Sequence, residues 1–397
     1  MWTSPQNDSS LPGDCVDIEK LIHILEETDE IELENVDIFA EELELFMSPL
    51  EKAMRPAEYR ELEFEAPIEE FRGEIPVVKF GHTKSEGGTR SHSLYVGGEK
   101  TMPFYRFEYE NPYKPVIAFD VFDMKIGLAK PVKVHYDEVL EDPAAWARLC
   151  VDKFGADMVT IHLISTDPLL KDTPIPEAVK TVEEVLQAVK VPIIIGGSGN
   201  PNKDPELLEK AAEVAEGERV MLNSASMNLD YKKVAQAALD HGHVVLSWTQ
   251  LDINDQKTLN RHLFEIGVQR ENMLIDPTTA ALGYGLEYSF SMMERMRLAA
   301  LKGDPDLQCP IASGTTNAWG AREAWMKESP TEGETWGDRM KRGPLWEAVS
   351  AFTLCLAGCD LFMMMCPTSV QLFREMITQL CEDREMNSAA DWLTGGA

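Results

Sequence analysis

The sequence predicts an α/β protein built on a (β/α)8 TIM barrel, and two observations lead to that prediction. From Pro115 onward, short apolar runs alternate with helical stretches, and this alternation is repeated eight times over roughly 265 residues. The runs are apolar at successive positions, as in a parallel sheet that is covered on both faces. Eight such units match a closed barrel in count and length. An open doubly wound sheet is the alternative, but it rarely keeps so regular an alternation through eight strands.

Each predicted strand is a short apolar run that ends in polar or small residues. The strands are expected at residues 116–119, 158–161, 193–195, 220–222, 244–246, 273–275, 310–312 and 361–365. Helices are expected to begin at or near Asp142-Pro143, Pro176, Asp204-Pro205, Asp230, Asn254 and Pro344. Residues 292–300 have the period of a further helix, and Thr368 and Gln371 have the spacing of a capping box at the start of the last one. Eight strand–helix units follow from these assignments.

The chain before the barrel divides into two regions. Residues 1–70 are predicted to be an acidic, partly disordered and partly helical N-terminal extension, which is either a solvated arm or a docking segment for another subunit. Residues 71–113 are predicted to be a β-hairpin region with strands at 77–80, 93–96 and 104–107, separated by paired glycines. The turn at residues 87–92 is a weak signal for anion or cofactor contact. The barrel is expected over 114–381, followed by a tail at 382–397.

Composition excludes several classes of partner. The formal net charge of -31 argues against binding to nucleic acid or to anionic membranes, since phosphate groups would be repelled. No charged leader and no long apolar run is present, so a cytoplasmic protein is expected. The seven cysteines indicate reduced thiols. Cys355, Cys359 and Cys366 lack the close Cys-x-x-Cys pair usual in iron–sulfur or zinc sites, so packed thiols are favoured over metal ligands.

Functional groups in this fold lie at the carboxyl ends of the strands. Those ends are rich in hydroxyl and amide residues, among them Ser165, Thr166 and Asn223. They also carry four carboxylates and one histidine, which are Asp120, Asp123, Asp252, Asp276 and His162. No nucleophile stands near His162, and lysine is scarce there, which disfavours hydrolytic and aldol enzymes. The carboxylates could bind a hard metal, although helix capping is the favoured interpretation. The glycine-rich segment 196–200 lacks the spacing of a phosphate loop.

Several blocks of sequence together resemble one family. They are residues 83–92, 96–98, 103–104, 120–124, 161–167, 196–200, 247–252, 275–301, 313–320 and 362–365. In this order and spacing they resemble the small (delta) subunit of the corrinoid iron–sulfur protein in the acetyl-CoA decarbonylase/synthase complex. The acidic N-terminal extension has no counterpart in that comparison.

The resemblance implies a heterodimer with a larger subunit that carries a [4Fe–4S] cluster and a corrinoid-binding domain. A cobalamin-type corrinoid would lie at the interface and carry a methyl group between a methyl-tetrahydropterin and the nickel site of CO dehydrogenase/acetyl-CoA synthase. The chain has no Asp-x-His-x-x-Gly corrinoid-ligand motif and no four-cysteine set, so the resemblance assigns both groups to the partner. A methyl-tetrahydropterin methyltransferase is a further expected partner.

The resemblance gives this chain no metal ligand and no catalytic residue of its own. The candidate cofactor-binding residues are Gly196, Gly197, Ser198, Asn200, Ser224, Ser226, Gln250, Thr278, Thr279, Gly314, Thr315, Thr316 and Asn317. The alternative function is a stand-alone pterin-dependent methyltransferase in which Asn223 and Asp276 hold the pterin.

Overall fold

The computed structural model describes residues 68–105 and 111–381. The predicted tail and nearly all of the predicted acidic extension lie outside these residues, so both stay predictions. In the described part of the chain, no helix is long and apolar enough to cross a membrane.

Eight parallel strands close into a barrel, which confirms the predicted fold. They are β3 (Val116–Phe122), β4 (Met158–His162), β5 (Ile193–Gly196), β6 (Met221–Ala225), β7 (Val244–Trp248), β8 (Met273–Asp276), β9 (Ile311–Gly314) and β10 (Cys359–Met364). The strands follow each other in chain order around the barrel, and β10 pairs with both β9 and β3 to close it. All carboxyl ends therefore meet at one end of the barrel, where the loops to the following helices begin.

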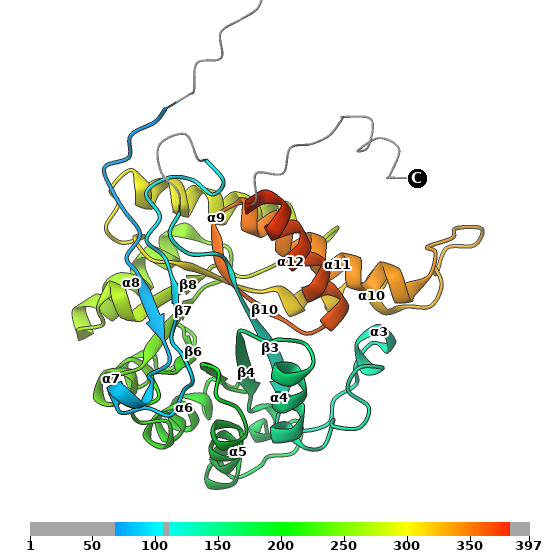
Figure 1. Ribbon diagram of the computed structural model, residues 1–397, viewed down its shortest axis with the longest axis horizontal. Helices are drawn as coiled ribbons and strands as arrows, with labels where there is room; N and C mark the ends of the chain where they lie inside the picture. The colour runs from blue at the N-terminus through cyan, green and yellow to red at the C-terminus, as the bar shows by residue number, and fades with distance from the viewer. Residues whose placement is uncertain (1–67, 106–110, 382–397) are drawn as a thin grey trace, which may run out of the picture. The chain divides into compact units, whose positions relative to one another are not determined.

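The main helices surround the strands (Figure 1). They are α4 (Pro143–Asp152), α5 (Ile175–Ala188), α6 (Asp204–Val214), α7 (Tyr231–His241), α8 (Ile253–Ile266), α9 (Leu286–Leu301), α11 (Arg339–Leu356) and α12 (Pro367–Cys381). Short helices α3 (Lys130–Lys133) and α10 (Arg322–Trp325), and the 3-10 turns η1 (Lys84–Glu86), η2 (Ile164–Thr166), η3 (Arg270–Asn272) and η4 (Thr315–Gly320), complete the described elements.

Two predicted helix starts were wrong. Helix α11 begins at Arg339, where the Asp338 side chain accepts from the Met340 amide, and Pro344 lies inside the helix instead of opening it. Helix α12 begins at Pro367, and its first turn is not held by the predicted capping box. The buried carboxylate of Glu347 on α11 accepts from the amides of Met365 and Cys366, which lie between β10 and α12. A side chain distant in sequence therefore holds the segment before the helix, and a local pattern cannot reveal it.

Carboxylates at other helix starts behave as the sequence predicts. Asp142, Asp230 and Asp252 each accept from amides in the first turn of their helices. Asp204 is different because it is the first residue of α6 and its carboxylate turns back to the preceding loop. The capping interpretation is therefore confirmed for Asp252, but the predicted cap at Asp204 was wrong.

A two-stranded hairpin lies at the amino end of the barrel. β1 (Val78–Phe80) pairs antiparallel with β2 (Leu94–Val96). Val78, Phe80 and Val96 are buried in one apolar cluster with the inward side chains of the barrel strands, such as Val116. The predicted strand at 104–107 was wrong in its described part, because Phe104 and Tyr105 form a turn and Phe104 has φ 59°. The hairpin thus closes the amino end.

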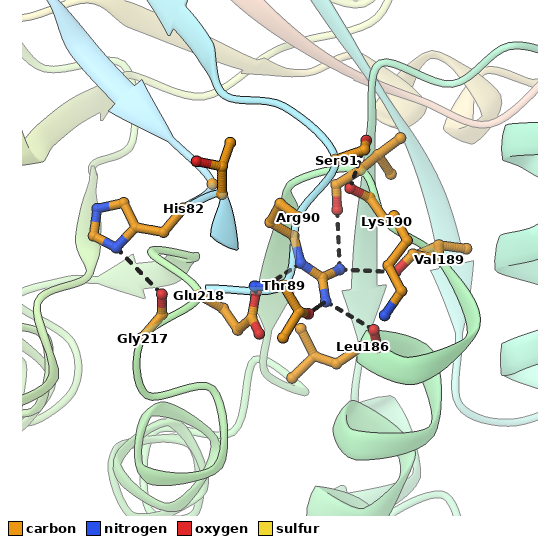
Figure 2. Close-up of polar contacts among 12 residues, drawn as sticks. His82, Thr89, Arg90, Ser91, Leu186, Val189, Lys190, Gly217 and Glu218 are labelled. Atoms are coloured by element: carbon orange, nitrogen blue, oxygen red, sulfur yellow. Dashed lines mark hydrogen bonds and ion pairs between the residues drawn. The ribbon is translucent and has the colours of Figure 1, made fainter. Parts of the chain in front are cut away.

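Arg90 fixes this closure from within the β1–β2 connection (Figure 2). Its guanidinium donates to Glu218 at 2.7 Å, and to the carbonyls of Val189, Val191 and Leu186 at 2.9, 3.2 and 2.8 Å. The fifth bond, to the Thr89 hydroxyl, is 2.6 Å long. An arginine has five N–H donors, so all of them are used. The weak anion signal at residues 87–92 therefore reflects a structural cation at the end of the barrel opposite the strand carboxyl ends.

Candidate functional site at the carboxyl end of the barrel

Alternate residues of each strand point into the barrel, and those nearer the carboxyl ends include polar side chains. Ala118, Met158, Met221 and Leu274 belong to the inner apolar cluster. Because alternate strand residues share a face, the inward positions nearer the carboxyl ends are Asp120, His162, Asn223 and Asp276, on strands β3, β4, β6 and β8. We call these four residues the mouth cluster. Polar groups therefore replace apolar ones as the barrel interior approaches its carboxyl end.

Asp120 and His162 form a close pair within the mouth cluster. Asp120 is 2% exposed, and its Oδ1 lies 3.1 Å from Nε2 of His162. These two buried atoms make no hydrogen bond of good geometry with each other or with other groups. The other oxygen of Asp120 accepts from the Thr316 hydroxyl, so the carboxylate is fixed from one side only. The His162 ring also stacks on Phe122, with ring centroids 4.9 Å apart.

Two glycines leave space beside the mouth cluster. A Cβ on Gly196 would come within 3.1 Å of Nδ1 of His162 and 3.7 Å of Nδ2 of Asn223. Gly314 lies across the barrel, and a Cβ there would come within 4.0 Å of Asp276 and 3.7 Å of Asn317. Glycine at both positions therefore keeps polar atoms of opposite walls accessible from the mouth.

Asp276 is buried with a single hydrogen bond, from the Thr278 amide at 2.8 Å. Burial raises the pKa of this carboxyl to about 7, and the bond from Thr278 lowers it only in part. Thr278 itself has φ 78°, a conformation that β-branched residues rarely adopt. Its hydroxyl donates to the Thr249 carbonyl at 2.6 Å, which ties the β8 loop to the β7 loop. Strain held in this way is typical of functional loops.

A buried polar network supports the β7 loop from outside the barrel. The Gln256 side chain accepts from the Thr249 hydroxyl at 2.8 Å and donates to that of Ser247, also at 2.8 Å. Ser247 donates to Asn260 at 2.7 Å. All four side chains are almost completely buried, so the network holds the end of β7 in a single arrangement.

The glycine-rich loop after β5 is held by Asp204. This carboxylate accepts from the amide and hydroxyl of Ser198 at 2.9 and 2.8 Å, and from the Gly199 amide at 2.7 Å. A Cβ on Gly197 would lie 2.5 Å from the carboxylate. Burial raises the pKa of Asp204, while the bonds from Ser198 and Gly199 oppose that shift. Glycine is therefore required at 197 by the approach of Asp204, without any ligand.

The predicted cofactor-binding residues fall into two groups. The first group has buried side chains and consists of Ser226, Thr279 and Thr315. The hydroxyls of Thr279 and Thr315 each form a hydrogen bond of 2.7 Å with the hydroxyl of Ser313. Partly or fully exposed positions are Gly197, Ser198, Asn200, Ser224, Gln250, Thr278, Gly314, Thr316 and Asn317, while Gly196 is buried beside His162. All of them lie at carboxyl ends of strands or in the following loops, as expected, but many of their polar groups interlock the loops.

The loops at this end also expose large apolar side chains. Leu169 and Leu170 follow β4, Met227 follows β6, and Tyr284 and Tyr288 follow β8, with exposures from 41% to 90%. Trp325 of α10 is 45% exposed. The Tyr284 hydroxyl donates to Glu323 at 2.9 Å, which joins the β8 loop to the segment after β9. Among the described residues, the three large apolar side chains with the highest exposure are Leu169, Tyr288 and Leu170, and exposure of this kind is typical of an interaction surface.

The sequence reasoning placed Asp120 and His162 at strand ends but did not bring them together. Counting alternate residues from Ala118 and Met158 would have put both inside the barrel on neighbouring strands. The contact of Thr316 with Asp120 spans 196 residues, and no local signal indicates it.

The fold and the site together define a (β/α)8 barrel with buried ionisable groups at the carboxyl ends of its strands. The loops around them form a rim of polar and apolar side chains. The family model described as "CO dehydrogenase/acetyl-CoA synthase delta subunit" matches residues 78–336, more than half of the chain. The chain belongs to this family of delta subunits.

Individual relatives agree. The chain is 59% identical over 326 residues to the acetyl-CoA decarbonylase/synthase complex subunit delta of Archaeoglobus fulgidus, covering 82% of this chain and 72% of the relative. It is 50% identical over 388 residues to that of Methanothermobacter thermautotrophicus, covering 94% and 96%. A dihydropteroate synthase structure from Xanthomonas albilineans has a TM-score of 0.44 at 16% identity, covering 68% of this chain and 94% of that one.

Proposed function

We propose that this chain is the small subunit of a corrinoid iron–sulfur protein and that its carboxyl-end rim holds a corrinoid shared with a larger subunit. When bound, the corrinoid supplies a cobalt centre that accepts and donates a methyl group. The larger subunit supplies the [4Fe–4S] cluster and the corrinoid-binding domain. The methyl group passes between a methyl-tetrahydropterin and the nickel site of CO dehydrogenase/acetyl-CoA synthase.

The chemistry of the rim supports this proposal. A corrinoid has broad apolar faces and an edge of amide groups. The exposed amides of Gln250 and Asn317 can bond to such an edge, and the exposed side chains of Tyr288 and Met227 can contact apolar surface. The single observation that carries the proposal is this rim in a chain of the delta-subunit family.

Metal analysis of the natively purified complex tests the proposal. We expect cobalt and iron in the wild-type complex, and reduced cobalt after Gln250→Trp or Asn317→Trp, because a bulky ring at an exposed rim position obstructs a flat ligand. Lys84→Trp, at the exposed η1 turn of the amino-end hairpin, is the matched control and should keep its cobalt. Cobalt contents that are equal in all three variants would remove the rim from the corrinoid site.

A second candidate function is binding of the methyl donor itself in the barrel mouth. Asn223 and Asp276 face inward on β6 and β8, and the Asp276 carboxyl can be charged or neutral near neutral pH. An amide and such a carboxyl suit a planar heterocycle that has both donors and acceptors, such as a pterin. Titration of the complex with a methyl-tetrahydropterin checks this function, and a binding curve that does not saturate would contradict it.

A further inference from the structure

Asp120 and His162 lie at the separation of a proton-transfer pair, 3.1 Å between Oδ1 and Nε2, with the two atoms out of line for a hydrogen bond. In such pairs a carboxylate orients one ring nitrogen, and the other ring nitrogen faces the reacting group. Here Nε2 is buried beside Asp120, at 3.1 Å. Nδ1 lies beside Gly196, where a Cβ would come within 3.1 Å of it.

The pair is supported by its neighbours. Thr316 fixes the outer oxygen of Asp120 by donating its hydroxyl to it. Phe122 stacks on one face of the imidazole and restricts its rotation. The His162 side chain is 21% exposed, so the ring borders both the interior and the mouth. Two residues of β3, Asp120 and Phe122, therefore contact the ring, and Thr316 of η4 acts on it only through Asp120.

We propose that His162, oriented by Asp120, donates a proton to the nitrogen leaving group of an N-methyl donor bound in the barrel mouth. This inference rests on the second candidate function above. The carbon–nitrogen bond breaks and its electron pair stays on nitrogen, which takes the proton from Nδ1 of His162. The methyl carbon forms its new bond to cobalt(I), with the electron pair of that cobalt. In the reverse direction His162 takes the proton back.

The need for a proton follows from the leaving group. An amine nitrogen that departs without a proton would carry a full negative charge, which is far too basic to form in water. A positioned acid removes that barrier and contributes about 10²- to 10⁴-fold to the rate. The titratable groups around the ring are Asp120 on β3, Asp123 directly after β3, Cys150 on α4 near Asp120, and Asp276 on the opposite strand. The neighbouring residues from β5 and η4 are Gly196 and Thr316, whose side chains do not titrate.

The test compares two methyl donors in the corrinoid-loaded complex. With the His162→Gln variant, we expect methyl transfer from methyl-tetrahydropterin to fall about 10²-fold or more. Transfer from methyl iodide should stay unchanged, because iodide leaves without a proton. Asp120→Asn should also slow transfer from methyl-tetrahydropterin, by a smaller factor, and leave transfer from methyl iodide unchanged. This second variant provides the test if His162→Gln does not fold. Cobalt content reports on corrinoid binding separately.

A binding measurement gives a second readout that does not depend on turnover. Affinity of the complex for the demethylated tetrahydropterin should be lower in His162→Gln than in wild type, because Nδ1 of the ring no longer faces the pterin nitrogen. Equal loss with both methyl donors, or no loss with either, would overturn the role of His162. A wild-type complex that binds no tetrahydropterin would instead contradict the candidate function on which the role rests.

Discussion

The two ends of the barrel use buried charged groups in opposite ways. At the amino end, Arg90 donates five hydrogen bonds, and Arg297 bonds to Glu99, Gly358 and Asp360 through its two terminal nitrogens while its Nε has no partner. At the carboxyl end, Oδ1 of Asp120 and Nε2 of His162 make no hydrogen bond, and Asp276 makes one. Buried ionisable groups that lack partners can be retained where a ligand or a proton completes them. The contrast between Arg90 and the Asp120–His162 pair supports the proposal that the carboxyl end is the functional end.

The largest expected effect comes from breaking the amino end. Arg90→Met leaves Glu218 and three carbonyls without their donor in the interior, so we expect a loss of about 3–5 kcal/mol in the free energy of unfolding. Denaturant unfolding of the variant measures this loss. The exposed Arg148→Met is the control and should change the free energy by less than about 0.5 kcal/mol. Equal stability of the two variants would contradict the structural role of Arg90.

The carboxyl end should instead make stability depend on pH. Because the pKa of Asp276 is about 7 in the folded chain and 3.8 ordinarily, the folded state holds the proton more tightly between these values. The raised pKa of Asp276 therefore stabilises the folded state fully below about pH 4. This contribution, about 4 kcal/mol in the free energy of unfolding, is lost as pH rises through about 7. Asp276→Asn should remove this slope, measured as unfolding free energy against pH.

The exposed Asp137→Asn provides the comparison for that measurement and should leave the slope in place. A slope that is the same in wild type and in Asp276→Asn would show that the buried carboxyl does not titrate in this range. Glu347, whose pKa burial also raises to about 7, contributes a slope of the same sign.

A smaller effect is expected in the loop after β5. Gly197→Ala places a methyl group 2.5 Å from the Asp204 carboxylate, so the loop must shift, at about 1–3 kcal/mol. Gly127→Ala has no atom within 4 Å of the new methyl group and should be neutral. Thermal unfolding of both variants checks the difference. A neutral Gly197→Ala would mean that Asp204 does not hold this loop in place.

The barrel could be predicted from sequence because its signal is repeated. Each apolar run and each following helix is local, and capping residues such as Asp142 and Asp230 mark the boundaries. The functional residues were less accessible to prediction. The pattern of hydroxyl and amide residues at strand ends predicts ligand contacts, yet Thr279 and Thr315 bond inside the protein. The sequence shows where such residues lie along the chain, but their partners come from loops that meet only in the closed barrel.

Hydrogen–deuterium exchange of the complex with its larger subunit, with and without corrinoid, tests the central claim most directly. We expect the loops at residues 196–200, 249–252 and 313–317 to exchange more slowly when corrinoid is bound, since they surround the carboxyl end. Exchange at residues 81–92 of the amino-end hairpin should be the same in both states. Slower exchange at residues 81–92 with no change in the carboxyl-end loops would contradict the assignment of the functional end.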